Sequence, residues 1–199
     1  MIPDKAGFFV VNNIHDLFEI LGAAATIVAA TVAVIALRGW RKQFVFGEKY
    51  KAIRDFHLAC QSSWDAYWYV SLGYDLLEDA WKNRDVESWF WGETEKLRNA
   101  WRISDASLYS AHMILQHHLT EEEKEIIHAV YWEFIEEARS GGSEVIAFST
   151  QFSMMIDEPV SQYEEVYLKG LSRRKLIDEK REVMCQKADE LLATYARPA

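Results

Sequence analysis

Residues 20–37 read ILGAAATIVAATVAVIAL, eighteen consecutive positions without a charged side chain. As a helix rising about 1.5 Å per residue, this stretch spans about 27 Å, close to the roughly 30 Å hydrocarbon core of a bilayer. A soluble-protein helix of this length is usually apolar on one side only, whereas this one is apolar all round. The stretch therefore predicts a transmembrane helix, which we place at residues 17–38.

The residues flanking the apolar stretch predict its orientation. Lysine and arginine follow it directly, whereas the charges just before it are the carboxylates of Asp16 and Glu19. Because lysine and arginine are enriched on the cytoplasmic side, residues 1–16 are expected outside the cytoplasm and residues 39–199 inside it. A tryptophan among the basic residues matches the aromatic belt of membrane interfaces. The predicted membrane-interface residues are Arg38, Trp40, Arg41 and Lys42.

Two alternative interpretations of the stretch are a buried helix of a soluble fold and a cleaved signal peptide. A signal peptide has its basic residues before the apolar segment, whereas here they come after it. We therefore favour an uncleaved anchor.

Small residues recur every fourth position along the apolar stretch. Gly22, Thr26 and Ala30 share one helix face, and Ala25, Ala29 and Ala33 share a neighbouring one. Such faces let helix backbones approach closely in lipid. This spacing predicts homo-oligomers formed through the anchor.

Composition excludes some classes of function for the remainder of the chain. The net charge is −9, and the negative excess falls after residue 42. Such an acidic domain repels phosphate backbones, so nucleic-acid binding is not expected. The two cysteines, Cys60 and Cys185, are far apart, and we expect packed, reduced thiols that suit a cytoplasmic location.

Periodic apolar residues predict helices over the rest of the chain, at about residues 48–82, 85–118, 120–140, 143–158 and 161–195. Gly47 marks a possible break from the anchor, and a further break is possible near residues 103–105. Thr120 and Glu123 form a capping box, the pair Gly141 and Gly142 should end one helix, and Pro159 marks a boundary. The predicted fold is all-α: one N-terminal transmembrane helix followed by an antiparallel helical bundle.

The expected buried faces follow three-and-four spacing. Five charged residues of the last helix fall on its opposite, solvated side: Glu179, Lys180, Arg181, Glu182 and Lys187. The apolar faces comprise Ile53, Phe56, Cys60, Trp64 and Tyr67, then Leu97, Trp101, Leu108 and Leu115, then Ile127, Val130, Tyr131, Phe134 and Ala138, and finally Ile177, Met184, Ala188, Leu191 and Tyr195.

The residues at the end of the apolar stretch resemble a motif found in other membrane proteins. Residues 37–43 read LRGWRKQ, and together with the apolar span and helical remainder they resemble a group of bacterial and phage single-pass membrane proteins that share a W-[KR]-K-Q stretch. The likeness covers roughly the first third of the chain. It implies the single-pass topology and a bacterial or phage source, and it carries no activity with it. With the charge asymmetry, we expect a location in the bacterial inner membrane.

Two groups of residues resemble metal ligands. Glu125 and His128 have the Glu-x-x-His spacing of di-iron and di-manganese bundles, but the sequence holds no second copy. His112, His117 and His118 cluster near acidic residues in a way that could suit zinc. We interpret the first pair as chance spacing, and the histidines as residues at a helix C-terminus, where positive charge is favoured. We therefore expect no metal, cofactor or catalytic residue.

Aromatic residues are concentrated between residues 64 and 91, where nine occur. One helix face cannot bury all of them, so some should pack a second helix, meet a sister subunit or form a partner site. A wide aromatic core is the alternative. The candidate partner surface comprises Trp68, Tyr69, Trp89 and Trp91.

Together these features predict a non-enzymatic, membrane-anchored helical module that contacts lipid and self-associates or binds a protein partner. Two alternatives are a metal-dependent helical-bundle enzyme and a membrane-perturbing phage or defence effector. The sequence names neither the process nor the partner.

Overall fold

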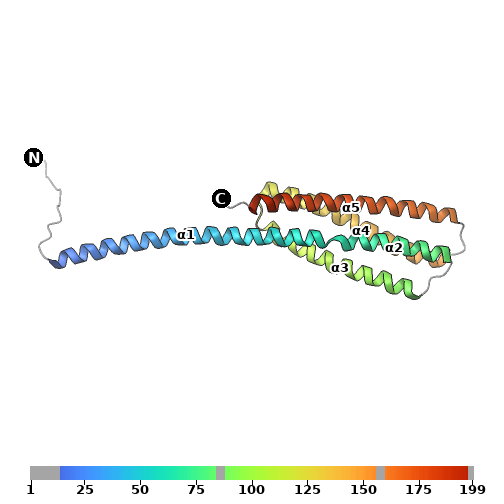
Figure 1. Cartoon of the computed structure of the whole chain (residues 1–199), viewed down its shortest axis with the longest axis horizontal. Helices are drawn as coiled ribbons and strands as arrows, with labels where there is room; N and C mark the ends of the chain where they lie inside the picture. Colours follow the sequence, from blue (N-terminus) through green and yellow to red (C-terminus); the bar gives the residue numbers. More distant parts are fainter. Residues whose placement is uncertain (1–13, 84–87, 156–159, 197–199) are drawn as a thin grey trace, which may run out of the picture. The chain divides into compact units, whose positions relative to one another are not determined.

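The computed structural model describes the backbone of residues 14–83, 88–155 and 160–196, and the side chains of residues 17–83, 90–151 and 164–196. These residues form helices joined by turns, without a strand (Figure 1). The helices are α1 (Ile14–Ser62), α2 (Trp64–Asn83), α3 (Ser88–Gln116), α4 (Glu121–Met155) and α5 (Val160–Ala196). The prediction of an all-helical chain is confirmed.

The chain divides into two compact units, Met1–Gly47 and Glu48–Ala199. Every described side chain of the first unit, from residue 17 to residue 47, is exposed. In the described part of the chain, one helix is long and apolar enough to cross a membrane. Helix α1 continues through Gly47, so the break considered there does not occur.

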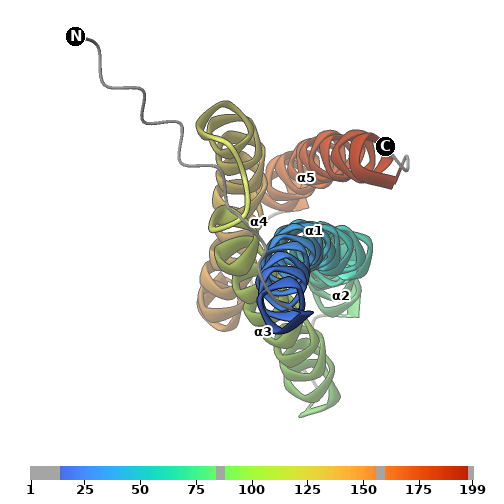
Figure 2. The same ribbon diagram turned by 90° about the vertical axis from the view of Figure 1, so that its left-hand side faces the viewer.

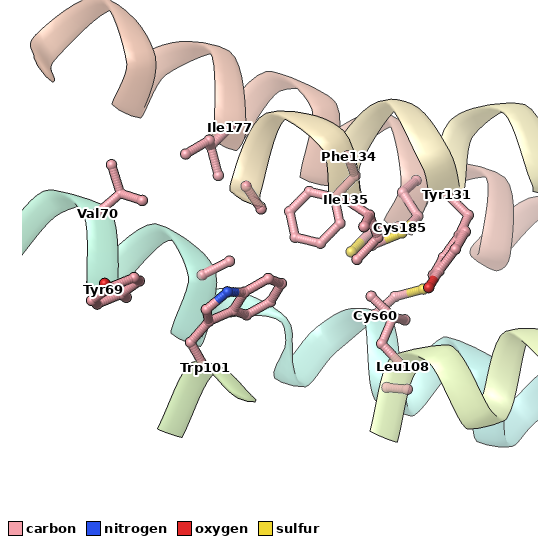
Figure 3. Packing of buried hydrophobic residues seen from close by; sticks show 14 of the residues in the cluster. Cys60, Tyr69, Val70, Trp101, Leu108, Tyr131, Phe134, Ile135, Ile177 and Cys185 are labelled. Carbon is pink, nitrogen blue, oxygen red and sulfur yellow. The ribbon is translucent and has the colours of Figure 1, made fainter. Parts of the chain in front are cut away.

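In the second unit, α2 contacts α3, α4 and α5, and α4 also contacts α3 and α5. Figure 2 shows α4 and α5 side by side in the view turned by 90°. Side chains from all these helices and from the last part of α1 form one core, part of which Figure 3 shows from close by. The largest fully buried side chains include Phe56, Tyr69, Tyr74, Phe90, Leu108, Tyr131, Phe134 and Ile177.

Most of the predicted apolar faces are buried. On α1, Ile53, Phe56 and Cys60 are fully buried, as expected. The faces of α3, α4 and α5 are likewise buried at Trp101, Leu108, Leu115, Ile127, Tyr131, Phe134, Ala138, Ile177, Met184 and Ala188. Five other residues of these faces are half-buried, namely Tyr67, Leu97, Val130, Leu191 and Tyr195. The one exposed exception is Trp64, which is 38% exposed.

That exception follows from a break at Ser63, so the single helix predicted over residues 48–82 is in fact two. The Ser63 hydroxyl donates a hydrogen bond to the Cys60 carbonyl at 2.6 Å, and its backbone N–H reaches the same carbonyl at 3.2 Å. The Ser62 carbonyl instead accepts a hydrogen bond from the Ser104 hydroxyl of α3 at 3.0 Å. A serine bonding to its own backbone competes with the helical ladder and shifts the buried face.

The prediction that Gly141 and Gly142 end a helix is wrong, because α4 runs through both residues. Both glycines are buried inside the bundle. A Cβ on Gly142 would lie 2.9 Å from Cε1 of Tyr69, and one on Gly141 would lie 3.1 Å from Cδ1 of Ile177. These glycines therefore provide room for neighbouring helices.

The capping box at the start of α4 is confirmed. The Glu123 N–H bonds to the Thr120 hydroxyl at 3.3 Å, and the Thr120 N–H returns a bond to the Glu123 carboxylate at 2.8 Å. Helix α3 has no break near residues 103–105. The boundaries expected at Asp85 and Pro159 lie outside the described residues.

Replacing Gly170 with alanine should destabilise the bundle, because the new Cβ would lie 2.6 Å from Cγ and Cδ1 of Tyr74. Overpacking of this kind costs about 1 to 3 kcal/mol. Thermal unfolding of the full chain in detergent micelles, followed by circular dichroism, measures the effect.

The matched control is Gly92→Ala in α3, where nothing lies within 4 Å of the added methyl group. Alanine there should stabilise the helix by roughly 0.5 to 1 kcal/mol. A Gly170→Ala midpoint at or above that of the wild type would contradict the close contact.

Candidate functional site

The predicted metal-ligand residues do not converge on one point. His112 on α3 is 1% exposed, and its ring stacks on that of the exposed His128 of α4 with centroids 5.5 Å apart. Glu125 and His117 are exposed and His118 is half-buried. Among the described residues, no group of three or more His, Cys, Asp or Glu side chains is arranged to hold a metal ion. The structure thus brings together only His112 and His128.

His112 is instead part of an aromatic stack in the core. Its ring lies parallel to that of Tyr131 at 3.9 Å and is tilted against Phe56 at 6.2 Å. The Gln116 amide donates a hydrogen bond to Nε2 at 3.0 Å, which leaves the ring proton on Nδ1. Within the described part of the chain, the buried Nδ1 atom and the buried Tyr131 hydroxyl have no hydrogen-bond partner.

Both buried groups stay uncharged at neutral pH. Burial, with a contribution from His128, lowers the pKa of His112 to about 4. Burial and the nearby Asp105 charge raise the pKa of Tyr131 to about 12. A general acid or base works best with a pKa near the operating pH. The stack therefore favours packing over proton transfer.

A second polar cluster joins α1, α4 and α5. The Lys49 ammonium donates a hydrogen bond to the Glu123 carboxylate at 3.1 Å and lies 4.0 Å from the centroid of the Tyr195 ring. The Tyr195 hydroxyl donates to the other Glu123 oxygen at 2.8 Å. One carboxylate of the α4 capping box thus also binds Lys49 of α1 and Tyr195 at the end of α5.

Glu123 and Lys49 of this cluster are both charged at neutral pH. Burial alone would raise the pKa of Glu123, but hydrogen bonds from the Thr120 backbone, Tyr195 and Lys49 outweigh it and lower the pKa to about 2. Burial would lower the pKa of Lys49, but hydrogen bonds with Tyr195 and Glu123 outweigh it and raise the pKa. The arrangement is suited to holding helices together.

The candidate partner surface is only partly on the outside of the bundle. Trp68 and Trp91 are each 47% exposed, whereas Tyr69 is 2% exposed and belongs to the core. The Tyr69 hydroxyl reaches the Gly142 carbonyl at 3.5 Å, which explains its burial. The side chain of Trp89 lies outside the described residues.

Trp68 belongs to an exposed aromatic cluster on α2, which we define as Trp64, Tyr67 and Trp68. The Tyr67 ring makes edge contacts with both tryptophans, with centroids 5.3 Å apart in each case. Large aromatic rings that remain accessible are typical anchors of protein interfaces. This α2 aromatic cluster is therefore a candidate contact surface.

Sequence reasoning missed the position of Arg181. It was expected on the solvated side of the last helix, but it is 5% exposed and stacks on Trp64 at 3.8 Å from the ring centroid. The signal was present, because Arg181 lies four residues after Ile177 and four before Cys185, on the apolar stripe of α5. Cys60 and Cys185 are both buried and free, as expected.

The predicted membrane-interface residues are exposed on α1, where Trp40 is 66% exposed. The Trp40 ring contacts that of Phe44, one turn later, at 6.2 Å. No known protein family matches the chain, and neither a curated protein nor a solved structure matches it.

The depressed pKa of His112 should make the folded protein less stable in mild acid. The unfolded chain takes up a proton below pH 6.5, whereas the buried imidazole resists protonation until about pH 4. The contribution of His112 to the free energy of unfolding should thus be fully present above pH 6.5. It should decrease as the pH drops toward 4, by up to about 3 kcal/mol. Unfolding midpoints measured in micelles between pH 7 and 5 record the first part of this loss.

His112→Phe keeps a ring against Tyr131 and should flatten this pH dependence. His117→Gln, at an exposed position, is the control and should keep the wild-type slope. Equal slopes for wild type and His112→Phe would show that another group causes the loss.

Proposed function

We propose that this chain is a non-enzymatic, single-pass membrane protein whose helical bundle self-associates or binds a protein partner at the cytoplasmic face. One observation carries the proposal: an uncharged helical stretch whose side chains are exposed, without cover from the other residues that the structure describes. Leaving that much apolar surface in water is unfavourable, and lipid is the solvent that suits it.

The polar atoms of this stretch are compatible with lipid. The Thr26 hydroxyl donates a hydrogen bond to the Gly22 carbonyl at 2.8 Å, and the Thr31 hydroxyl donates to the Ile27 carbonyl at 2.8 Å. Inside a bilayer every polar group must find its partner within the protein, and these two hydroxyls do so within their own helix.

The charges at the end of the stretch support an orientation with the N-terminus outside. Arg38, Arg41 and Lys42 are exposed and available to lipid headgroups, and the contact of Trp40 with Phe44 suits an interfacial belt. Together with the resemblance, this supports placement in a bacterial inner membrane.

Cross-helix contacts support the proposal that the bundle is antiparallel. Lys49, near the start of the second unit, meets Tyr195 at the end of α5. Farther along, Tyr74 of α2 contacts Gly170 in the first part of α5. Phe56 and Ser62 of α1 meet His112 and Ser104 of α3 in the same reversed order.

Two features support association. The small-residue face at Gly22 is open, since nothing lies within 4 Å of a Cβ there. The α2 aromatic cluster leaves Trp68 47% exposed.

The pKa values of buried groups support a binding role over acid–base chemistry. Those of His112 and Tyr131 in the aromatic stack, and that of Glu123 in the polar cluster, all lie well away from neutral pH.

Membrane insertion predicts that the chain stays in the membrane pellet after alkaline carbonate washing. The double variant Ile27→Asp and Val28→Asp should move it to the supernatant, because each charge at a span centre costs about 2.5 to 3.5 kcal/mol. Ile103→Asp, at a position that is 73% exposed on α3, is the control and should remain in the pellet. Release of the wild-type chain would end the membrane proposal.

Self-association predicts that chemical crosslinking in native membranes yields oligomers. Gly22→Leu should lower that yield if the anchor mediates contact, and Trp68→Ala with Trp91→Ala should lower it if the bundle surface does. Gly39→Leu, which also places its side chain in open space but off the small-residue face, is the control. Identical oligomer yields for all these variants, or no oligomer at all, would contradict self-association through these surfaces. Binding of a different protein would then be the only remaining form of the proposal.

A further inference from the structure

The two cysteines of the chain lie together although 124 residues separate them in the sequence. Cys60 belongs to α1 and Cys185 to α5, and both side chains face the interior of the bundle (Figure 3). Both residues belong to the same buried core cluster, and each thiol is near enough to influence the pKa of the other. Cys60 is completely buried, whereas Cys185 retains 8% exposure. The two cysteines are therefore neighbours in the core, and Cys185 is the less deeply buried of the two.

A buried cation stands beside this pair. Arg181 lies one turn before Cys185 and is 5% exposed, with Trp64 covering its guanidinium group at 3.8 Å. Its Nε atom is buried and has no hydrogen-bond partner among the residues that the structure describes. Buried polar atoms are nearly always paired, so a guanidinium held this way calls for an explanation. An anion forming next to it would provide one.

The electrostatic environment makes the two thiols unequal. The neighbouring Cys60 thiol, helped by the positive charge of Arg181, lowers the pKa of Cys185 despite burial and the opposing charges of Asp189 and Glu182. Burial, together with the neighbouring Cys185 thiol, raises the pKa of Cys60 well above its usual range. The thiolate is the reactive form of cysteine, so Cys185 is the expected nucleophile and Cys60 the second thiol.

We propose that Cys60 and Cys185 form a reversible dithiol–disulfide site that is oxidised by hydroperoxides and joins α1 to α5. This inference is independent of the proposed membrane function. The site is absent from the sequence pattern, because neither cysteine has a partner at motif spacing.

The oxidation proceeds in two steps. The Cys185 thiolate attacks the terminal oxygen of the hydroperoxide, so that an S–O bond forms and the O–O bond breaks. The leaving oxygen takes a proton and departs as water or an alcohol, and Cys185 becomes a sulfenic acid. Cys60 then attacks the Cys185 sulfur, the S–S bond forms, and the hydroxyl group leaves as water with the Cys60 proton. A small-molecule dithiol reverses the reaction by thiol–disulfide exchange and is itself oxidised to a disulfide.

The consequence for the protein is a covalent link between the helix that carries the apolar stretch and the last helix of the bundle. Such a link closes a long loop of chain and constrains the unfolded state. The oxidised protein should unfold at a temperature roughly 10 °C higher than the reduced protein.

The test uses the reduced full chain in detergent micelles, with hydrogen peroxide as the oxidant. Free thiols are then blocked with N-ethylmaleimide and the intact mass is measured. We expect a monomer that has lost two hydrogen atoms, carries no maleimide, yields one crosslinked peptide containing Cys60 and Cys185, and reverts with dithiothreitol. In Cys60→Ser, a sulfenic acid should accumulate at Cys185 and be trapped by dimedone.

Substitutions of charged residues near Cys185 test whether these charges control the rate of disulfide formation. Arg181→Met should slow disulfide formation several-fold, because the thiolate loses its buried counter-charge. Lys180→Met, which removes a neighbouring cation paired with Glu133, is the matched control and should keep the wild-type rate. Asp189→Asn removes an opposing negative charge and should accelerate oxidation, which keeps the test informative if Arg181→Met unfolds.

Three outcomes would overturn the proposal. Both thiols could remain fully alkylated after peroxide treatment of the folded protein. Cys185 could oxidise to a sulfinic acid while Cys60 stays free. The disulfide could form no faster in the folded protein than in chains unfolded by urea, which would mean that the bundle contributes nothing to the pairing.

Discussion

The rings of Tyr69 and Tyr74 lie directly against glycine backbone on two other helices, and this contact sets how closely α2 packs with α4 and α5. Tyr69 meets Gly142 on α4, and Tyr74 meets Gly170 on α5. A bulky ring on one helix needs an empty place on the next, since protein interiors tolerate neither overlap nor voids. The remaining core side chains pack at the separation that these pairs allow.

Ion pairs fix the register of α5 within the same packing. Arg173 bonds to both Glu137 and Glu144, which lie two turns apart on one face of α4. The Tyr74 hydroxyl also donates a hydrogen bond to Glu144 at 3.2 Å. Burial alone would raise the pKa of Glu144, but the hydrogen bonds from Arg173 and Lys169 outweigh it and lower the pKa. Sliding α5 by one turn would break these contacts together, so the apolar core and the charges specify one arrangement.

The sequence predicted the features that depend on local chemistry. The uncharged run is visible because no charge interrupts it, and the capping box of Thr120 and Glu123 is visible because its two partners are three residues apart. Glycine was ambiguous: the pair at 141 and 142 has the composition of a helix end, but only the position of Tyr69 shows that it serves packing. Ser63 gave no stronger signal than any other serine.

The site residues were harder to predict because their partners come from distant parts of the chain. Arg181 follows the apolar spacing of α5, but its burial depends on Trp64 of another helix. Cys60 and Cys185 could be placed on buried faces one at a time, whereas their proximity required the packing of α1 against α5. The spacing of Glu125 and His128 suggested a metal ligand pair, but only His128 came to lie beside another of the candidate ligands, His112.

The polar cluster at Lys49 determines which helices share a force applied to α1. Lys49 belongs to the turn of α1 that follows Gly47, and it is tied to the first turn of α4 through Glu123 and to the last turn of α5 through Tyr195. A pull along α1 therefore reaches two helices at their ends at the same moment. Because Lys49, Glu123 and Tyr195 contact one another, a force on this turn of α1 is shared between α4 and α5.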